Sequence, residues 1–110
     1  MSFISESSSW GEATKRAVWD KAQKDTDENE QNGFRKDQCG AWICWQAYGD
    51  RSNEYGWEID HITPQSKGGG DELSNLRPLH WKNNASRQDG RLSCVVRSEG
   101  AKNIDSTTTS

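Results

Sequence analysis

The sequence has no uninterrupted apolar stretch long enough to span a membrane, and its N-terminus lacks the basic-then-apolar order of a secretory signal. These two absences make the cytoplasm the expected compartment. Cysteine is also scarce. Cys39, Cys44 and Cys94 form an odd set, which argues against a disulfide framework and is compatible with reduced thiols inside a cell, because any pairing would leave one thiol over.

Hydrophobic residues make up only 30% of the 110, so we expect one small domain that needs aromatic side chains or an ion to complete its core. Tryptophan can supply much of that core, since each large ring buries a large area. The six tryptophans lie in the first three quarters of the chain, where we therefore expect the compact body: Trp10, Trp19, Trp42, Trp45, Trp57 and Trp81.

An excess of positive charge is missing as well, because the formal net charge is −3. This argues mildly against non-specific nucleic-acid binding, which needs lysine and arginine for phosphate contacts. The charges are unevenly distributed, however. Residues 20–30 hold five acidic against two basic side chains, whereas residues 60–97 hold six basic against four acidic ones. The second half of the chain is therefore locally basic.

The composition along the chain predicts four segments. Residues 1–10 are serine-rich and are expected to form a flexible arm. Residues 11–33 combine a helix, predicted from apolar residues at helical intervals up to residue 24, with an acidic loop that has no apolar residue. Residues 34–98 form the expected core, and residues 99–110 the expected disordered tail.

Two short strands are predicted within that core. Residues 56–61 alternate, with Trp57 and Ile59 on one side and Asp60 on the other, as in a half-buried strand. A loop with three glycines follows. Residues 76–79 resume the apolar pattern, and Pro78 must lie at an edge because it has no N–H, as a two-stranded ribbon allows.

Three further elements are expected around this ribbon. The apolar run 40–45 is predicted to be a short buried element, either a strand or the first turns of a helix. Residues 80–88 are predicted to include a short helix that lies on the ribbon and ends before Gly90. Residues 91–97 are predicted to add a last strand.

This arrangement would place Asp60, at the end of the first strand, opposite a helix residue such as Asn84. Both side chains can offer oxygen atoms to one hard cation, the ligand type that magnesium, manganese or calcium prefers. His61 is not needed as a ligand. Its imidazole can instead take a proton from water and direct that water at phosphorus, while the cation stabilises the leaving oxygen. A phosphodiester is the substrate that most needs both groups.

The same residues resemble a known family. Asp60-His61, the glycine-rich loop, Asn75 fourteen positions after the histidine and Asn84 nine positions later are similar to the HNH endonucleases. The resemblance is close over about residues 56–89 and weaker over 39–55. It implies an α+β fold: a small single domain with a ββα-metal (His-Me finger) centre, made of a two-stranded ribbon and a short helix, with an extra N-terminal helix.

The resemblance also implies roles for individual residues. Asp60 would be a metal ligand, His61 the general base, and Asn75 a structural residue that holds the loop and the histidine's backbone. Asn84 would be the second ligand, a His-Asn-Asn variant that favours magnesium or manganese, and Arg87 could reach a phosphate. Four further basic residues are candidates for nucleic-acid contacts, although each alone is more often solvated surface: Lys67, Arg77, Lys82 and Arg91.

Each assignment has a structural alternative. Asp60 could be a turn or cap residue, His61 a core histidine bonded to a carbonyl, and Asn84 a helix terminus. Glu58, on the side of Asp60, is expected to be a solvated strand carboxylate. Many HNH relatives bind a structural zinc through four cysteines. Here only Cys39, Cys44 and His80 are available at unsuitable spacing, so we expect no structural zinc and tryptophan packing in its place.

We therefore predict an endonuclease that hydrolyses DNA phosphodiester bonds with one divalent cation, Mg²⁺ or alternatively Mn²⁺. The expected partner is duplex DNA with weak sequence preference, and no membrane is involved. One alternative is a catalytically inactive nucleic-acid- or partner-binding module on the same fold, which the acidic net charge favours. A second alternative is a toxin-like nuclease that needs an immunity protein. Magnesium-dependent nicking separates the first alternative from an active enzyme.

Overall fold

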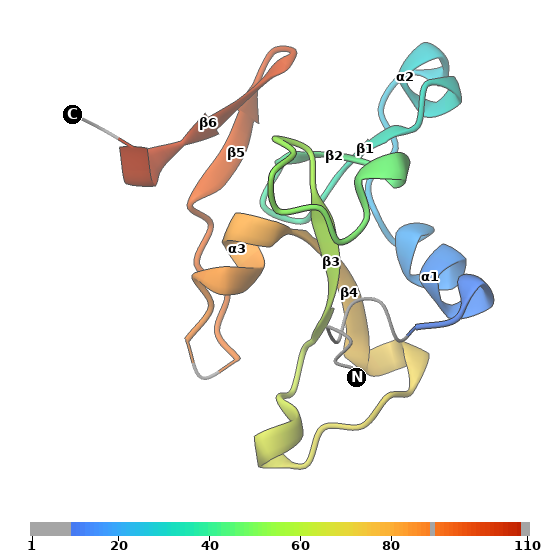
Figure 1. Cartoon of the computed structure of the whole chain (residues 1–110), viewed down its shortest axis with the longest axis vertical. Helices are drawn as coiled ribbons and strands as arrows, with labels where there is room; N and C mark the ends of the chain where they lie inside the picture. Colours follow the sequence, from blue (N-terminus) through green and yellow to red (C-terminus); the bar gives the residue numbers. More distant parts are fainter. Residues whose placement is uncertain (1–9, 89, 109–110) are drawn as a thin grey trace.

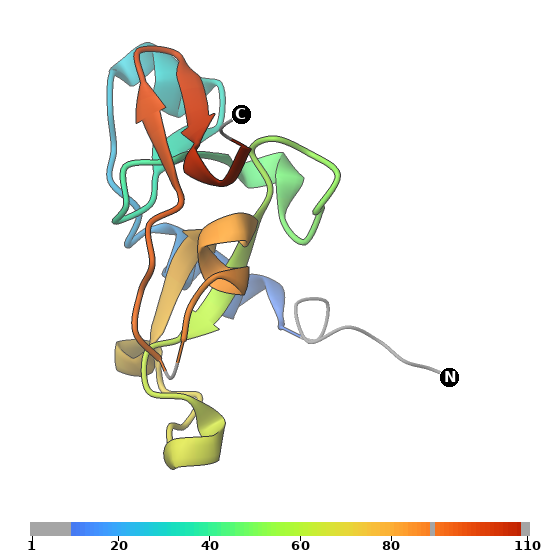
Figure 2. The ribbon, with the colours of Figure 1, turned by 90° about the vertical axis from the view of Figure 1, so that its left-hand side faces the viewer.

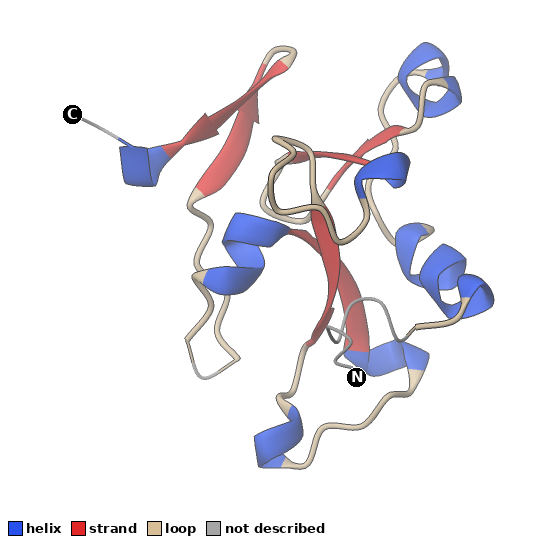
Figure 3. Cartoon of the chain, viewed as in Figure 1, coloured by secondary structure: helices blue, strands red, loops and turns tan. Residues whose placement is uncertain are grey.

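We describe residues 10–88 and 90–108 in a computed structural model of the chain. Residues 1–9 of the predicted arm lie outside the described residues, and Trp10, predicted as its last residue, packs against the core. Short strands and few helices make up a small α+β fold, as predicted (Figure 3). In chain order the elements are α1 (Glu12–Trp19), α2 (Asp27–Gln31), β1 (Phe34–Lys36), β2 (Trp42–Cys44), β3 (Trp57–His61), β4 (Leu76–His80), α3 (Trp81–Ala85), β5 (Val96–Glu99) and β6 (Lys102–Asp105).

The strands pair as three antiparallel two-stranded ribbons, β1–β2, β3–β4 and β5–β6. The β3–β4 ribbon is the one predicted around the glycine loop, and Pro78 lies opposite Ile59 in it. The backbone hydrogen bonds at the two ends of the ribbon place Ile59 and Pro78 at a position without ladder hydrogen bonds. Because β4 pairs only with β3 among the described residues, the missing N–H of Pro78 costs no ladder hydrogen bond. Helices α1 and α3 lie on opposite sides of this ribbon (Figures 1 and 2).

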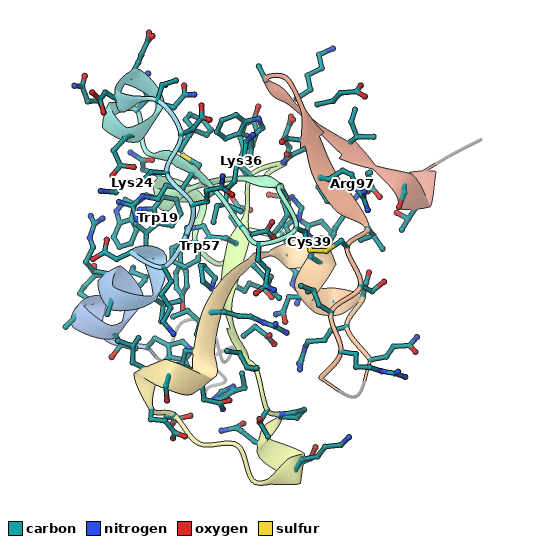
Figure 4. The ribbon with its side chains drawn as sticks, turned by 180° about the vertical axis from the view of Figure 1, so that it is seen from behind. Trp19, Lys24, Lys36, Cys39, Trp57 and Arg97 are labelled. Carbon is teal, nitrogen blue, oxygen red and sulfur yellow. A yellow bond between two sulfur atoms is a disulfide. The ribbon has the colours of Figure 1, made fainter. Side chains whose placement is uncertain are left out.

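Tryptophan side chains form the centre of the core, as predicted. The rings of Trp19, from α1, and Trp57, from β3, lie 5.0 Å apart and are almost fully buried (Figure 4). Ile43 and Leu76 complete the contact between α1 and the ribbons. Tyr48 packs against the same cluster, and burial raises the pKa of its hydroxyl to about 12. Among the described residues no helix is long and apolar enough to cross a membrane.

The prediction of a plain acidic loop at residues 25–33 was wrong, because α2 lies within it. The Thr26 hydroxyl caps this helix by accepting a hydrogen bond from the N–H of Asn29 at 3.0 Å. Acidic side chains in the first turn stabilise α2 because they lie near the positive end of the helix dipole. Glu30 also accepts two hydrogen bonds, of 2.8 and 2.6 Å, from the buried guanidinium of Arg35, which lower the pKa of Glu30. Capping and this ion pair replace the missing apolar contacts.

The prediction of a disordered tail from residue 99 was also wrong, since β6 and the turn after it extend to residue 108. The β5–β6 hairpin docks onto β2 through polar contacts. The side chain of Asn103 accepts a hydrogen bond from the N–H of Trp42 at 2.7 Å and donates one to its carbonyl at 3.0 Å. Such contacts join residues 61 positions apart, so no local pattern in the sequence could have indicated them.

The expectation of reduced thiols is corrected for two of the three cysteines. Cys39 and Cys94 form a disulfide with a Cα–Cα distance of 5.4 Å, and Cys44 remains a free thiol (Figure 4). An odd count excludes complete pairing but not a single bond between residues that the fold brings together. The disulfide removes Cys39 as a zinc ligand. A disulfide also gives no support to the expected cytoplasmic compartment.

His80 holds the junction between β4 and α3. Its buried ring accepts a hydrogen bond from the N–H of Lys82 at 3.1 Å through Nδ1, which caps α3, and Nε2 donates to the carbonyl of Glu54 at 2.8 Å. These contacts need the neutral ring with its proton on Nε2. Burial lowers the pKa of His80 accordingly.

We expect this histidine to make the fold less stable in mild acid. Because the folded-state pKa of His80 is lowered, the unfolded chain binds more protons, so the stabilisation is complete above about pH 6.5 and is lost as the pH falls below it. The free energy of unfolding should drop by about 1 kcal/mol, the usual effect of losing a helix cap. Urea unfolding of wild type and His80→Gln at several pH values measures it. An equally steep pH dependence in His80→Gln would contradict the assignment.

Candidate active site

A cavity of about 410 Å³ lies where β3 ends beside α3. It brings together four residues that the sequence analysis selected: Asp60, His61, Asn84 and Arg87. Two come from the end of β3, one from α3 and one from just beyond α3. The remaining wall is formed by Trp10, Ile59, Pro64, Gln65 and Ser66.

Asp60 is 2% exposed, so it is neither a solvated cap nor a residue of an open polar face. Its Oδ2 accepts a hydrogen bond of 2.6 Å from Nε of Arg77, its partner across the β3–β4 ladder. Its Oδ1 lies 2.9 Å from Nε of Arg87. The two atoms are close enough for an ion pair, but the N–H does not point at the oxygen, and neither atom has a hydrogen-bond partner. Asp60 therefore keeps one unsatisfied buried oxygen.

Asn84 has the same property. Its Nδ2 donates a hydrogen bond of 2.8 Å to Oε1 of Glu58, while its Oδ1 is buried without a hydrogen-bond partner. An ionised carboxylate can only accept hydrogen bonds, so Glu58 determines which end of the amide faces it. The amide oxygen is then directed away from Glu58 and is available to a ligand.

Glu58 is not the solvated strand carboxylate that we predicted, since it is only 7% exposed. Nε and Nη2 of Arg51 donate to its two oxygens at 2.6 and 2.9 Å. This bidentate pair compensates for the burial of the charge. The sequence did place Glu58 and Asp60 on the same side of the strand, but Arg51 comes from the loop before β3 and carried no signal.

His61 makes a contact that the sequence analysis missed. Its Nε2 lies 2.7 Å from Oδ1 of Asp71, and its ring centroid lies 5.7 Å from that of Trp10. Asp71 directly follows the three glycines, so its position depends on the path of a loop. In the sequence, the acidic residue after the glycines did not indicate that it would contact His61.

Asn75 ties together the two ends of that loop. Its Oδ1 accepts a hydrogen bond from the N–H of Thr63 at 2.8 Å, and Nδ2 donates to the carbonyls of Thr63 at 3.1 Å and Gly70 at 2.8 Å. The loop passes close to itself here, because a Cβ on Gly69 would lie 1.8 Å from the Thr63 carbonyl oxygen. Asn75 thus holds the chain just beyond His61 rather than the backbone of His61 itself.

The predicted nucleic-acid contacts fall into two groups. Lys67 and Arg91 are exposed. Arg77 is 11% exposed and paired with Asp60, so it does not lie on the surface as a phosphate contact would require. Lys82 forms an ion pair with Asp105. Of the four candidates, the structure therefore leaves Lys67 and Arg91 exposed.

Within residues 10–88 and 90–108 no three His, Cys, Asp or Glu side chains are grouped so that they could hold a metal ion. Asp60 and Asn84 supply one carboxylate and one buried amide oxygen to the cavity, and Gln65 and Ser66 also line it. Magnesium often binds proteins through only one or two side chains and keeps several waters. The donor set is therefore sparse, but of the type that a hard cation accepts.

The family model of the HNH endonuclease matches residues 39–90, which span β2 to α3 and all of the cavity except Trp10. No curated protein and no solved structure gives a significant match. Proteins of the matched family are generally nucleases that act on DNA and typically use a divalent metal. Over residues 39–90 the chain is therefore similar to the HNH endonuclease family.

Proposed function

We propose that the protein is a metal-dependent endonuclease that hydrolyses phosphodiester bonds of DNA. The observation that carries this proposal is a pair of unsatisfied buried oxygens, Oδ1 of Asp60 and Oδ1 of Asn84, on residues that line one cavity with His61. Leaving such buried atoms without a hydrogen bond is costly, and native structures usually satisfy them with protein, water or an ion. The β3–β4 ribbon and α3 would then form a ββα-metal centre.

The residues fit a hard divalent cation. Asp60 would supply a charged oxygen and Asn84 a neutral one, the donor types that Mg²⁺ and Mn²⁺ accept. Glu58 supports this assignment, because it accepts a hydrogen bond from Nδ2 of Asn84 and so directs Oδ1 of Asn84 away from its own carboxylate. When bound, the cation would stabilise the negative charge on the leaving oxygen.

His61 would act as the general base. With Asp71 as the acceptor at Nε2, the neutral ring carries its proton there and leaves the Nδ1 lone pair free to take a proton from water. Asp71 would orient the ring, and Asn75 would hold the loop that carries Asp71. The activated water would then attack phosphorus from the side of His61.

One observation favours the rival function, a binding module that no longer cuts. Both Arg77 and Arg87 contact the carboxylate of Asp60, so its charge is already compensated by side chains. A protein that keeps the fold and has lost the cation would show this arrangement too. The two functions make opposite predictions for DNA cleavage.

Nicking of supercoiled plasmid tests the proposal. We expect cleavage with Mg²⁺ or Mn²⁺ at scattered sites on several plasmids, and excess EDTA should stop it while circular dichroism reports an intact fold. Asp60→Asn should lower both the rate and the affinity for Mn²⁺, because it removes the charged oxygen ligand.

Asp20→Asn is a suitable control, since this exposed carboxylate belongs to the C-cap residue of α1, outside the cavity. It should leave cleavage unchanged. A folded wild type that cuts no plasmid with any of Mg²⁺, Mn²⁺, Ca²⁺ or Zn²⁺ would refute the nuclease and favour the binding module.

A further inference from the structure

Asp60 lies between two arginines that differ in how firmly they are held. Arg77 makes a hydrogen bond of 2.6 Å to Oδ2 and is 11% exposed. It lines a different cavity, together with Lys21 and Gln38. Arg87 approaches Oδ1 and lines the candidate active-site cavity. Arg77 thus contacts Oδ2 and lines one cavity, whereas Arg87 contacts Oδ1 and lines the other.

The contacts of Arg87 are poor. Its Nε lies 2.9 Å from Oδ1 of Asp60 without a hydrogen bond and is buried without any hydrogen-bond partner. Its Nη1 donates to the carbonyl of His61 at 3.4 Å, which is long for an N–H···O bond. A guanidinium held in this way can exchange its partner at small cost.

The charges at the cavity also favour an exchange. One carboxylate, Asp60, faces two guanidinium groups, whereas the nearby Glu58 is balanced by Arg51. A divalent cation at Oδ1 of Asp60 would lie against the positive charge of Arg87, and like charges at contact in a buried site repel strongly. A phosphodiester, by contrast, offers Arg87 the anionic oxygens that a guanidinium binds best.

We propose that Arg87 releases Oδ1 of Asp60 and moves to the substrate phosphate, so that the divalent cation and the phosphodiester bind to this cavity cooperatively. Arg77 keeps Asp60 in place during the exchange through its bond to Oδ2. The inference rests on the proposed function and specifies how its site is filled. By thermodynamic linkage, DNA raises the affinity for the cation by the same factor by which the cation raises the affinity for DNA.

Manganese binding tests this exchange without measuring cleavage. The full chain with His61→Ala, which should not cut, is titrated with Mn²⁺ by calorimetry and by electron paramagnetic resonance, alone and with a short synthetic DNA duplex. We expect the duplex to tighten Mn²⁺ binding by about tenfold or more. Adding Arg87→Met should tighten Mn²⁺ binding about tenfold in the absence of DNA and should remove most of the effect of the duplex.

Arg97→Met is the matched control, because it removes one positive charge from an exposed position on β5, outside the cavity. Arg97→Met should leave the effect of the duplex on Mn²⁺ binding intact. If Arg97→Met removed this effect as Arg87→Met does, the inference would be overturned. Mn²⁺ binding that Arg87→Met leaves unchanged or weakens, in a variant whose circular dichroism is native, would overturn it alone. No Mn²⁺ binding by wild type or by any of the variants would overturn both this inference and the cation site of the proposed function.

Discussion

His61→Ala should reduce magnesium-dependent DNA cleavage by about 10²- to 10⁴-fold, the usual contribution of a general base. The physical reason is that no other described side chain lining the cavity is suited to take a proton from water at neutral pH: Asp60 is ion-paired with two arginines, and Asn84 and Arg87 are not bases. Single-turnover plasmid nicking measures the rate, and Mn²⁺ titration tests whether the cation still binds.

Chemical rescue provides a sharper control for the same variant. Removing the His61 ring enlarges the cavity that it lines, and free imidazole could then enter and restore part of the cleavage. A variant that keeps most of the wild-type rate without imidazole would show that His61 is not the base. Loss of Mn²⁺ binding together with activity would instead indicate that His61 acts on the cation site.

Breaking the Cys39–Cys94 bond should cost the largest amount of stability of any change considered. The two cysteines are 55 positions apart, and in the chain-entropy description a disulfide closing a loop of this length stabilises the fold by about 4 kcal/mol. That loop contains the β3–β4 ribbon, α3 and the candidate active site. We therefore expect Cys39→Ser/Cys94→Ser, or reduction with dithiothreitol, to lower the midpoint of urea unfolding strongly and to loosen the β5–β6 hairpin.

The free thiol supplies the control for this experiment. Cys44→Ser leaves the disulfide intact and should change the unfolding midpoint little, and reductant should then destabilise Cys44→Ser as much as wild type. An unfolding midpoint that is the same in oxidised and reduced protein would contradict the stabilising role. Hydrogen exchange at the amides of β5 and β6 would locate the loosened region.

The central part of the fold could be predicted because its signals are local. Alternating side chains indicated the strand at 56–61, and three glycines and Pro78 delimited the ribbon. The helix of Asn84 followed from the short polar segment after His80. The motif spacing identified the family, and the family model confirmed it. Each of these signals depends on residues that lie within a few positions of one another or at spacings typical of the family.

The local pattern did not indicate α2, β6 or the disulfide, and the last strand predicted over residues 91–97 begins only at Val96, as β5. α2 has no buried residue and depends on a cap and on the pairing of Glu30 with Arg35. The hairpin depends on the contact of Asn103 with Trp42, and the disulfide joins two cysteines that are 55 positions apart in the sequence. The contacts of the hairpin and the disulfide join distant segments and leave no periodic pattern in the sequence. The contacts of α2 are local, but they are polar and therefore add no apolar periodicity.

The sequence by itself indicated the ribbon, the short helix and four residues that line the candidate site, because these follow from hydrophobic alternation, turn residues and motif spacing. Only the tertiary structure decided how those side chains are paired. Arg77 and Arg87 contact Asp60, Glu58 orients Asn84 and Asp71 meets His61. The physical reason is that burial makes each charged or polar group depend on whichever partner the fold brings within reach, and that partner lies elsewhere in the chain.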